Sequence, residues 1–344
     1  MSSGIDVLIA GAGPAGSATA AHLARRGYRV VVVDRAAFPR DKACSEYVGP
    51  EALRLLDDLG VVGELEQAGA QPLFGTTVVA PRGAALTGLF SRTAVRPYRD
   101  TGLSVARRIL DQALVNVARQ AGAEVRERLT AEELLYKSGA VAGLLVRDAG
   151  GGRHSIRARL TIGADGLRSL VARSIGRRHL GFPARLAFVA HLANVAGLEG
   201  IAELHVGEQG YVGLNRIAPG LANVALVVPR GHAPAARGDV TGYFLSQLDR
   251  FPAVRDRVRP ADIAREVMVT GPFAAWSGRV AVNGALLVGD AADFFDPFTG
   301  EGIYSALKGA ELAAHTAASA LAHDGIPTAR RLAGYRMARR ATFL

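Results

Sequence analysis

The sequence is poor in cysteine and aromatic residues, and it lacks long apolar runs. Cys44 is the single cysteine among 344 residues, so an internal disulfide is excluded and a reducing compartment such as the cytoplasm is favoured. Apolar runs of about 18 residues, which could span a bilayer, are missing, as are the basic start and cleavage site of a secretory signal within Met1–Gly13. These absences predict a cytoplasmic protein that is neither secreted nor membrane-spanning.

Metal and nucleic-acid motifs are also missing. The 8 histidines are dispersed without the spacing of metal ligands, and no GxSxG or GxxxxGK motif occurs. The net charge of +10 would suit nucleic acid or an anionic membrane, but the arginines are scattered and lack interleaved aromatic residues. The sequence predicts no metal and no nucleic-acid partner.

One local concentration of charge lies in the C-terminal segment. It contains Arg330, Arg331, Arg336, Arg339 and Arg340. This pattern predicts a solvated helix face, with peripheral contact to lipid headgroups or to an acidic substrate as the alternative.

The sequence does contain a glycine-rich motif, GAGPAG, directly after an apolar run. IDVLIAGAGPAG is an apolar run that opens into glycines, and a helical segment to about Gly27 and the run YRVVVVD follow it. This order predicts strand, tight turn, helix and strand. Gly11 permits the turn, Gly13 lets the backbone approach a pyrophosphate, and Gly16 lets the helix pack closely, while the first helical turn, with Pro14 and Ala15, offers amide groups to phosphates. The alternative is a glycine-rich turn without function.

A carboxylate ends the second apolar run. Asp34 stands where an acidic side chain accepts hydrogen bonds from a ribose and would repel the 2′-phosphate of NADP, and Arg35 follows it. The helix predicted from Ile109, Leu110, Ala113, Leu114 and Val117 begins near Arg107, four residues before Asp111.

Two later stretches repeat the pattern of an apolar run that ends in an acidic residue. RARLTIGADG ends in Asp165 and Gly166, which predicts either a carboxylate facing a groove or a simple Asp-Gly turn. GDAADFFDPFTGEGI, from Gly289 to Ile303, follows GALLV and precedes a helix predicted from Ile303, Ala306, Leu307, Ala310 and Ala314. The amide groups at its start, near Gly300 to Gly302, would stabilise negative charge. The alternative is a Pro/Gly loop before an ordinary core helix.

In their order and spacing, the three stretches resemble FAD-dependent oxidoreductases of the aromatic-hydroxylase (PHBH) type, and the third resembles the geranylgeranyl reductase branch. The resemblance covers about residues 4 to 322. It implies an α/β fold in which a PHBH-type, Rossmann-like FAD-binding domain carries an inserted antiparallel-sheet substrate domain. It also implies that Asp290 binds the flavin ribityl chain and that Arg107 faces the phosphates. The cofactor-binding residues expected from motif and resemblance are Gly11, Gly13, Pro14, Ala15, Gly16, Asp34, Arg35, Lys42, Arg107, Asp165, Gly289, Asp290, Pro297, Gly300, Glu301 and Gly302.

The domain layout expected from this fold is discontinuous. Residues 1–73, 98–180 and 271–344 are assigned to the FAD-binding domain, and residues 74–97 and 181–270 to the substrate domain. Stretches such as TTVVAPRGAALTGLF and RLAFVAHLANV mix apolar and polar residues at short range, as antiparallel strands with one covered face do. Many family members extend beyond the position of Leu344, so the resemblance implies that this chain either lacks their C-terminal helices or is a shortened form.

Two residues are candidates for the chemistry. By resemblance, Lys42 and Cys44 match a family segment beside the flavin, although Ser45-Glu46-Tyr47 replaces its usual glycines. Cys44 is expected to donate a proton or tune the flavin, or else to be a small buried side chain. Tyr211 is expected to line the pocket or to be an ordinary sheet tyrosine. The segment from Gly210 to Val228 lacks the aromatic residues of geranylgeranyl reductases and the paired tryptophans of halogenases, which argues against a polyprenyl substrate and against halogenation.

The sequence therefore predicts a FAD-dependent oxidoreductase that acts on a hydrophobic small molecule of isoprenoid or polyketide-like type. Reduction of a carbon-carbon double bond is the first reading. A monooxygenase that hydroxylates or epoxidises an aromatic or alkene substrate is the alternative, and a flavin-binding protein without turnover is the third. A single GxGxxG motif implies that NAD(P)H visits only transiently as reductant or that a separate electron donor or reductase acts.

Overall fold

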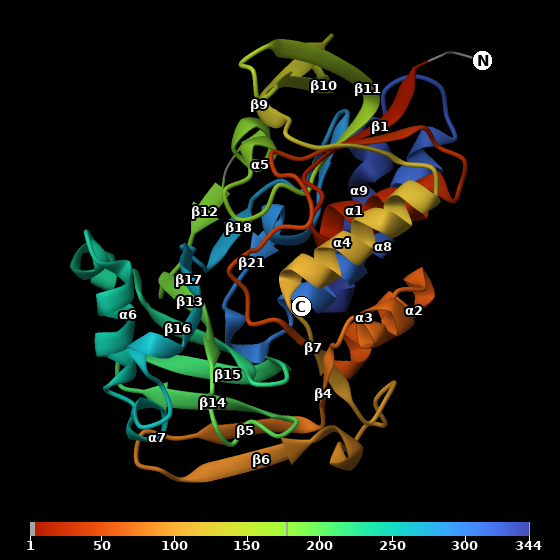
Figure 1. Cartoon of the computed structure of the whole chain (residues 1–344). Helices are drawn as coiled ribbons and strands as arrows, with labels where there is room; N and C mark the ends of the chain where they lie inside the picture. Colours follow the sequence, from red (N-terminus) through yellow and green to blue (C-terminus); the bar gives the residue numbers. More distant parts are fainter. Residues whose placement is uncertain (1–3, 177, 344) are drawn as a thin grey trace.

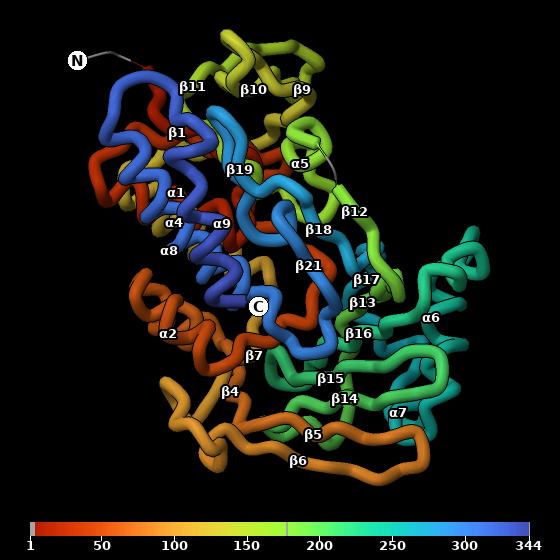
Figure 2. The backbone as a smooth tube through the Cα atoms, turned by 180° about the vertical axis from the view of Figure 1, so that it is seen from behind, coloured from red at the N-terminus to blue at the C-terminus, as the bar shows by residue number. Residues whose placement is uncertain are grey.

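The computed structural model describes residues 4–176 and 178–343. Figure 1 shows one large sheet with its helices in the upper part of the molecule and a second large sheet below it. The chain passes between these two parts several times, as the tube in Figure 2 makes clear. Residues 1–3, 177 and 344 lie outside this description.

The described residues of the upper part form an eight-stranded sheet with the order β19-β20-β11-β1-β2-β8, to which β10 and β9 attach through β11. Its parallel strands are β1 (Ile5–Ala10), β2 (Val30–Val33), β8 (Glu124–Arg126), β11 (Arg153–Gly163) and β20 (Ala285–Leu287). Antiparallel pairing adds β9 (Thr130–Lys137), β10 (Ala140–Arg147) and β19 (Ala281–Val282). The four valines of β2 are all buried, as expected for a parallel strand covered on both faces.

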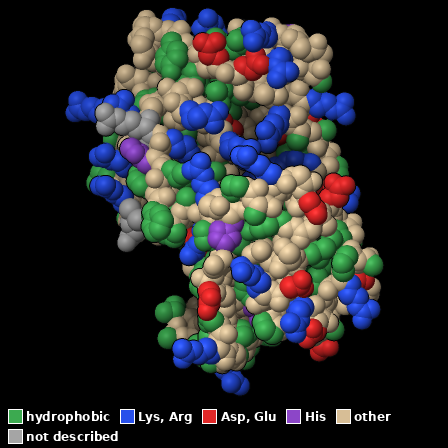
Figure 3. All heavy atoms as spheres, turned by 90° about the vertical axis from the view of Figure 1, so that its left-hand side faces the viewer, with side chains coloured by type: hydrophobic (Ala, Val, Ile, Leu, Met, Phe, Trp, Pro, Cys, Tyr) green, Lys and Arg blue, Asp and Glu red, His purple; other side chains and the backbone are tan. Residues whose placement is uncertain are grey.

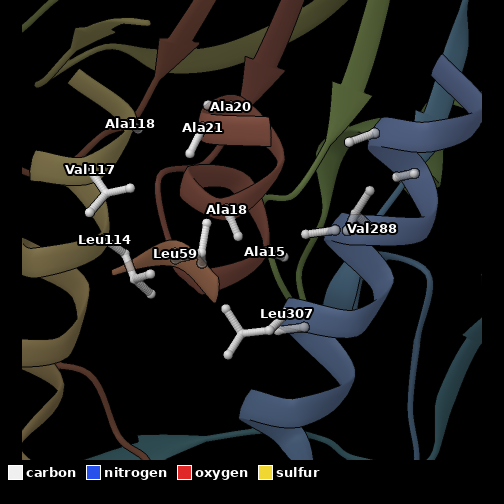
Figure 4. Close-up of a cluster of buried hydrophobic side chains, with 14 of the residues drawn as sticks. Ala15, Ala18, Ala20, Ala21, Leu59, Leu114, Val117, Ala118, Val288 and Leu307 are labelled. Carbon is white, nitrogen blue, oxygen red and sulfur yellow. The ribbon is translucent and has the colours of Figure 1, made fainter. Parts of the chain in front are cut away.

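Small residues allow the helices to pack closely beside this sheet. Figure 4 shows α1 (Pro14–Ala24) between α4 (Arg107–Gln120) and α8 (Gly302–Leu321), with its alanines turned toward Leu114 and Leu307. The residues used to predict α8 are buried: Ile303, Ala306, Leu307, Ala310 and Ala314. The other helices of this part are α2 (Pro50–Leu59), α3 (Val62–Gln67), α5 (Leu170–Ile175) and α9 (Ala329–Phe343).

The lower sheet has seven strands among the described residues, in the order β17-β13-β16-β15-β14-β5-β6. They are β17 (Ile263–Thr270), β13 (Arg185–Ala193), β16 (Leu221–Pro229), β15 (Gly210–Ala218), β14 (Ile201–Gly207), β5 (Gly75–Val79) and β6 (Ala85–Leu89). All neighbours are antiparallel except β14 and β5. Helices α6 (Val240–Leu248) and α7 (Pro252–Arg255) pack on one face. The predicted fold class is confirmed, while the boundaries of the two domains stay a prediction.

Two small sheets lie between the large ones in Figures 1 and 2. One contains β3 (Tyr47–Val48), β7 (Gly102–Ser104) and β4 (Gln71–Leu73), and the other contains β12 (Arg178–Leu180), β18 (Ala275–Ser277) and β21 (Asp293–Phe294). None of the helices within the described residues combines the length and the apolar character that crossing a membrane requires.

The basic C-terminal segment differs from its prediction at one position. Arg330, Arg331, Arg336 and Arg340 are exposed on α9, but Arg339 is buried, and its Nη2 lies 2.7 Å from both carboxylate oxygens of Asp293. The expectation of a solvated face is therefore wrong for Arg339. A single basic residue on the inner side of a helix joins that helix to an acidic partner far away in the sequence.

Candidate functional site

A cavity of about 780 Å³ lies where the carboxyl ends of the parallel strands meet the open face of the seven-stranded sheet. This volume falls within the range of about 300–1,000 Å³ that is usual for ligand sites. Figure 3 shows a hollow bordered by Lys and Arg side chains on the side of the molecule that lies at the left of Figure 1. The basic residues that line the cavity are Arg35, Arg40, Lys42, Arg107, Arg168 and Arg173.

The glycine-rich turn after β1 has the conformation that its sequence requires. Gly11 has a φ of +97°, and a Cβ atom there would lie 2.5 Å from the carbonyl oxygen of Ala164. A Cβ at Gly16 would lie 1.8 Å from the oxygen of Gly11, so Gly16 allows the helix to approach the turn. At Gly13 the nearest atom would be Arg40 Nη2 at 3.8 Å. A ligand can therefore approach this backbone closely.

Asp34 holds the same turn in place from the end of β2. Its Oδ2 accepts a hydrogen bond from the amide of Ala12 at 2.7 Å, and its Oδ1 accepts one from the amide of Ala36 at 2.8 Å. Each carboxylate oxygen has a second lone pair, and Asp34 lines the cavity and is partly exposed. The residue thus has both a structural role and remaining capacity for a ligand hydroxyl.

Three basic residues and one buried carboxylate form a cluster beside the turn. Arg107 donates two 2.8 Å hydrogen bonds to Asp111 within α4, and Arg40 Nη1 lies 2.9 Å from Asp111 Oδ2. Burial opposes the charge of Arg107, but Asp111 and the Cys44 thiol raise the pKa of its guanidinium overall. Burial, and then the charge of Arg107, lower the pKa of the Lys42 ammonium, while Asp290 and Asp111 oppose this. Arg40 could not be recognised from the sequence, because its partner Asp111 lies on a helix about seventy residues later.

Asp165 lines the cavity and also accepts hydrogen bonds at the start of a helix. Its carboxylate accepts hydrogen bonds from Ser169 Oγ at 2.5 Å and from the Leu170 amide at 2.6 Å, at the start of α5. Burial raises the pKa of this carboxyl group, and these hydrogen bonds oppose the shift. Asp165 lines the cavity, as expected, and its oxygens also cap α5. A contact between this carboxylate and the cofactor stays a prediction.

The third stretch brings a helix start to the cavity. Asp290 lies in η4 (Gly289–Ala291) and is partly exposed there, and α8 begins at Gly302, as predicted. Gly300 follows η5 (Pro297–Thr299) with a φ of +72°, and a Cβ there would lie 2.7 Å from Tyr47 Cδ1. Three of the expected cofactor-binding residues do not line the cavity, namely Gly16, Gly289 and Glu301. All others in that set do.

Tyr211 lines the cavity, but its phenol is already engaged. The hydroxyl donates to Asp296 Oδ1 at 2.5 Å, and Arg185 Nη1 donates to Asp296 Oδ2 at 2.8 Å. Burial and Asp296 raise the pKa of Tyr211 far above its usual value. Tyr211 therefore fixes the loop before α8 against the sheet and is a poor source of protons.

Cys44 lies half-buried on the cavity wall beside charged groups. Its sulfur accepts a hydrogen bond from the amide of Glu46 at 3.4 Å and neighbours the guanidinium of Arg107. Sequence reasoning missed Glu46, which is fully buried, and Tyr47, whose ring lines the cavity and whose pKa is raised by burial. A glutamate where relatives often carry glycine was the available signal.

The family whose description is "FAD binding domain" matches residues 4–210, which include the turn, the Cys44 segment and Asp165. The chain belongs to this family. It is a FAD-dependent oxidoreductase, as the resemblance predicted, and its similarity to proteins named digeranylgeranylglycerophospholipid reductase assigns it to the geranylgeranyl reductase-like branch.

Named relatives extend this comparison. The chain is 31% identical over 341 residues to digeranylgeranylglycerophospholipid reductase 2 of Methanothermobacter thermautotrophicus, covering 96% of this chain and 82% of the relative. It is 29% identical over 341 residues to menaquinone reductase of Mycolicibacterium smegmatis, covering 91% and 76%. It is 31% identical over 322 residues to conditioned medium factor receptor 1 of Dictyostelium discoideum, where it covers 90% of its own length and 62% of that relative.

Solved structures share the whole architecture. A myxobacterial chondrochloren halogenase, a FAD-dependent enzyme, superposes with a TM-score of 0.89 at 26% identity over 98% of this chain and 80% of that one. A geranylgeranyl bacteriochlorophyll reductase-like protein from Thermoplasma acidophilum gives a TM-score of 0.82 at 22% identity over 98% and 83%. The second likeness concerns the fold alone.

Proposed function

We propose that this oxidoreductase reduces a carbon-carbon double bond in a hydrophobic small molecule of isoprenoid or polyketide-like type. The supporting observation is the apolar sheet side of the cavity, lined by Ala187, Val189, Leu204, Ala225, Val227, Met268 and Phe273. An apolar wall of this kind favours hydrocarbon over charged ligands. Relatives named as reductases of a digeranylgeranyl lipid and of menaquinone support the same substrate class.

The residues around the glycine-rich turn fit FAD. In this proposal the open backbone at Gly13 and the start of α1 hold the pyrophosphate, with Arg40, Lys42 and Arg107 supplying positive charge. Asp34 accepts from a ribose hydroxyl. Bound FAD supplies the hydride or oxygen chemistry that side chains cannot.

The protein's part in the reaction is binding, exclusion of water and supply of a proton. The start of α8 at Gly302 places helix amide groups at the cavity, where they favour negative charge. Cys44 is proposed as the proton donor because it lies on the cavity wall and carries an exchangeable proton. Tyr211 is assigned to positioning, since Asp296 holds its proton.

Reduction and oxygenation are separated by an anaerobic experiment. The purified protein, expected to contain noncovalent FAD, is reduced by light in the absence of oxygen and mixed with candidate alkenes. A reductase reoxidises under these conditions, and its product gains two hydrogens. A monooxygenase stays reduced until air is admitted, and its product then carries label from heavy oxygen gas. The likeness to a halogenase structure keeps the oxygen-dependent alternative in the test.

The source of electrons and the possibility of binding without turnover are tested separately. We propose that NAD(P)H acts as a transient reductant, or that a separate donor protein does, because the chain carries one dinucleotide fingerprint. Anaerobic bleaching of the flavin by NADH or NADPH supports the first route. A flavin that no nicotinamide and no added reductase can bleach indicates a binding protein instead.

A further inference from the structure

Four polar side chains lie next to one another across the seven-stranded sheet, in a region whose neighbouring rows are apolar. They are Arg265 on β17, His191 on β13, Asn223 on β16 and Asn215 on β15. His191 pairs in register with both Arg265 and Asn223, and Asn223 pairs with Asn215. The row two residues further along β13, β16 and β15, formed by Val189, Ala225 and Gly213, lines the cavity. Because strand side chains alternate between faces, the polar row shares the cavity face and lies at one end of it.

Each member of the row reaches toward the segment that carries Cys44 or the strand beside it. His191 Nε2 lies 2.7 Å from Glu46 Oε2, and Asn223 Nδ2 donates to the backbone oxygen of Ser45 at 3.0 Å. Asn215 bonds to Ser104 Oγ on β7. Arg265 Nη1 lies 3.7 Å from Asp41 Oδ1, which is an ion-pair distance but too long for a hydrogen bond. The row therefore holds the segment from residue 41 to 46 at several points.

Glu46 joins this row to the residues on the opposite side of the segment. It is fully buried and has a φ of +55°. Its Oε1 accepts the amide hydrogen of Arg107 at 2.9 Å, its backbone oxygen accepts from Val105 at 3.0 Å, and its own amide donates to Cys44 Sγ at 3.4 Å. A buried carboxylate persists only when such partners satisfy it. Glu46 is thus the junction between the sheet, the start of α4 and the cysteine.

We infer that Glu46 and the three members of the polar row that make hydrogen bonds, His191, Asn223 and Asn215, are positioning residues that fix Cys44 at the cavity wall. Apolar side chains would fill the same space without the cost of burying charge, but they would leave the register between segment and sheet less defined. Directional hydrogen bonds specify one arrangement. The role of Cys44 as a proton donor rests on the proposed function. The position in which these residues hold Cys44 does not depend on that function.

The test uses the fact that Cys44 is the single cysteine of the chain. The native protein is treated with a chromogenic aryl disulfide, and the rate of thiol release reports on Cys44 alone. Glu46→Ala removes two side-chain bonds and Asn223→Ala removes one, so local opening of the segment becomes more frequent, and labelling is expected to be roughly tenfold faster in each. Glu46→Gln keeps the oxygen that accepts from Arg107 and the length to reach His191, so it is expected to restore slow labelling.

A matched control exists on the opposite face of the same sheet. His205 Nε2 lies 2.7 Å from Glu203 Oε2, the same distance as in the pair of His191 and Glu46, and His205 is equally buried. It pairs in register with Val212, whose side chain packs under α6 and away from Cys44. His205→Asn is therefore expected to lower stability without changing the labelling rate.

Two results would overturn the inference: wild-type labelling rates in Glu46→Ala and Asn223→Ala, or equal acceleration by His205→Asn. If Glu46→Ala does not fold, Asn223→Ala, which loses only one hydrogen bond, carries the test. Labelling needs neither substrate nor turnover. Accelerated labelling in a protein that reduces no alkene would support the inference while refuting the proposed function, so the two failures are distinguishable.

Discussion

Replacing Asp111 with asparagine removes a buried negative charge that is shared by two guanidinium groups beside the glycine-rich turn. Asp111 is fully buried, accepts two 2.8 Å hydrogen bonds from Arg107, and lies 2.9 Å from Arg40. Asparagine keeps the shape but loses the charge, so Arg107 stays buried without a counter-ion. Breaking a buried pair in this way costs about 3–5 kcal/mol.

An exposed pair with the same geometry provides the comparison. Arg126 donates to both oxygens of Glu124 at 2.8 and 3.0 Å, but the Arg126 side chain is 37% exposed and that of Glu124 59%. Water and salt replace most of such an interaction, so Glu124→Gln is expected to cost less than about 1 kcal/mol. The bidentate bond is of the same kind in both pairs, and the variants differ in burial and in the second arginine, Arg40, that Asp111 also contacts.

Urea unfolding of the FAD-free proteins, followed by circular dichroism, measures the difference. With a dependence on urea of about 3 kcal/mol per molar, the midpoint of Asp111→Asn is expected to fall by about 1–1.7 M. The midpoint of Glu124→Gln should move by less than about 0.3 M. Equal midpoints for the two variants would show that burial does not set the strength of the Arg107–Asp111 pair, and the reasoning would fail.

Three further predictions concern the turn, a lysine and a tyrosine. Gly16→Ala places a methyl group 1.8 Å from the Gly11 oxygen and is expected to abolish FAD binding in a fluorescence titration, whereas Gly63→Ala, where the added carbon has no neighbour within 4 Å, should leave it unchanged. Because burial and Arg107 lower the pKa of Lys42, its ammonium loses its charge at a pH below the ordinary lysine pKa of about 10.4. FAD affinity should therefore weaken as the pH rises toward that value, and Lys42→Met should bind FAD weakly at every pH. An identical pH dependence in the variant would contradict this. Because burial and Asp296 raise the pKa of Tyr211, the folded protein keeps a proton that the unfolded chain releases above about pH 10. The urea midpoint should therefore decrease as the pH rises beyond about 10, and it should decrease less steeply in Tyr211→Phe.

The sequence alone was enough to predict those helices, strands and turns that depend on a pattern of neighbouring residues. The buried valines of β2, the glycine turn and the start of α8 near Gly302 follow from hydrophobic period, from positive φ and from helix start signals, all of which act over a few residues. The order of the three stretches was enough to indicate the family, and the family comparison confirms it. The alternation of apolar and polar residues also indicated the inserted antiparallel strands.

Tertiary structure decided which polar groups are free to act. Asp165 and Tyr211 were chosen for their chemistry, but a helix start and an aspartate engage them. Arg339 and Glu46 were missed as buried groups, because their partners lie 46 and 145 residues away. A charged side chain is buried only when an oppositely charged or hydrogen-bonding partner lies next to it in the fold. The spacing of residues along the chain does not show which distant residue that partner is. The sequence by itself therefore determined the fold and the cofactor class, while the assignment of each side chain to structure or to chemistry depended on long-range contacts.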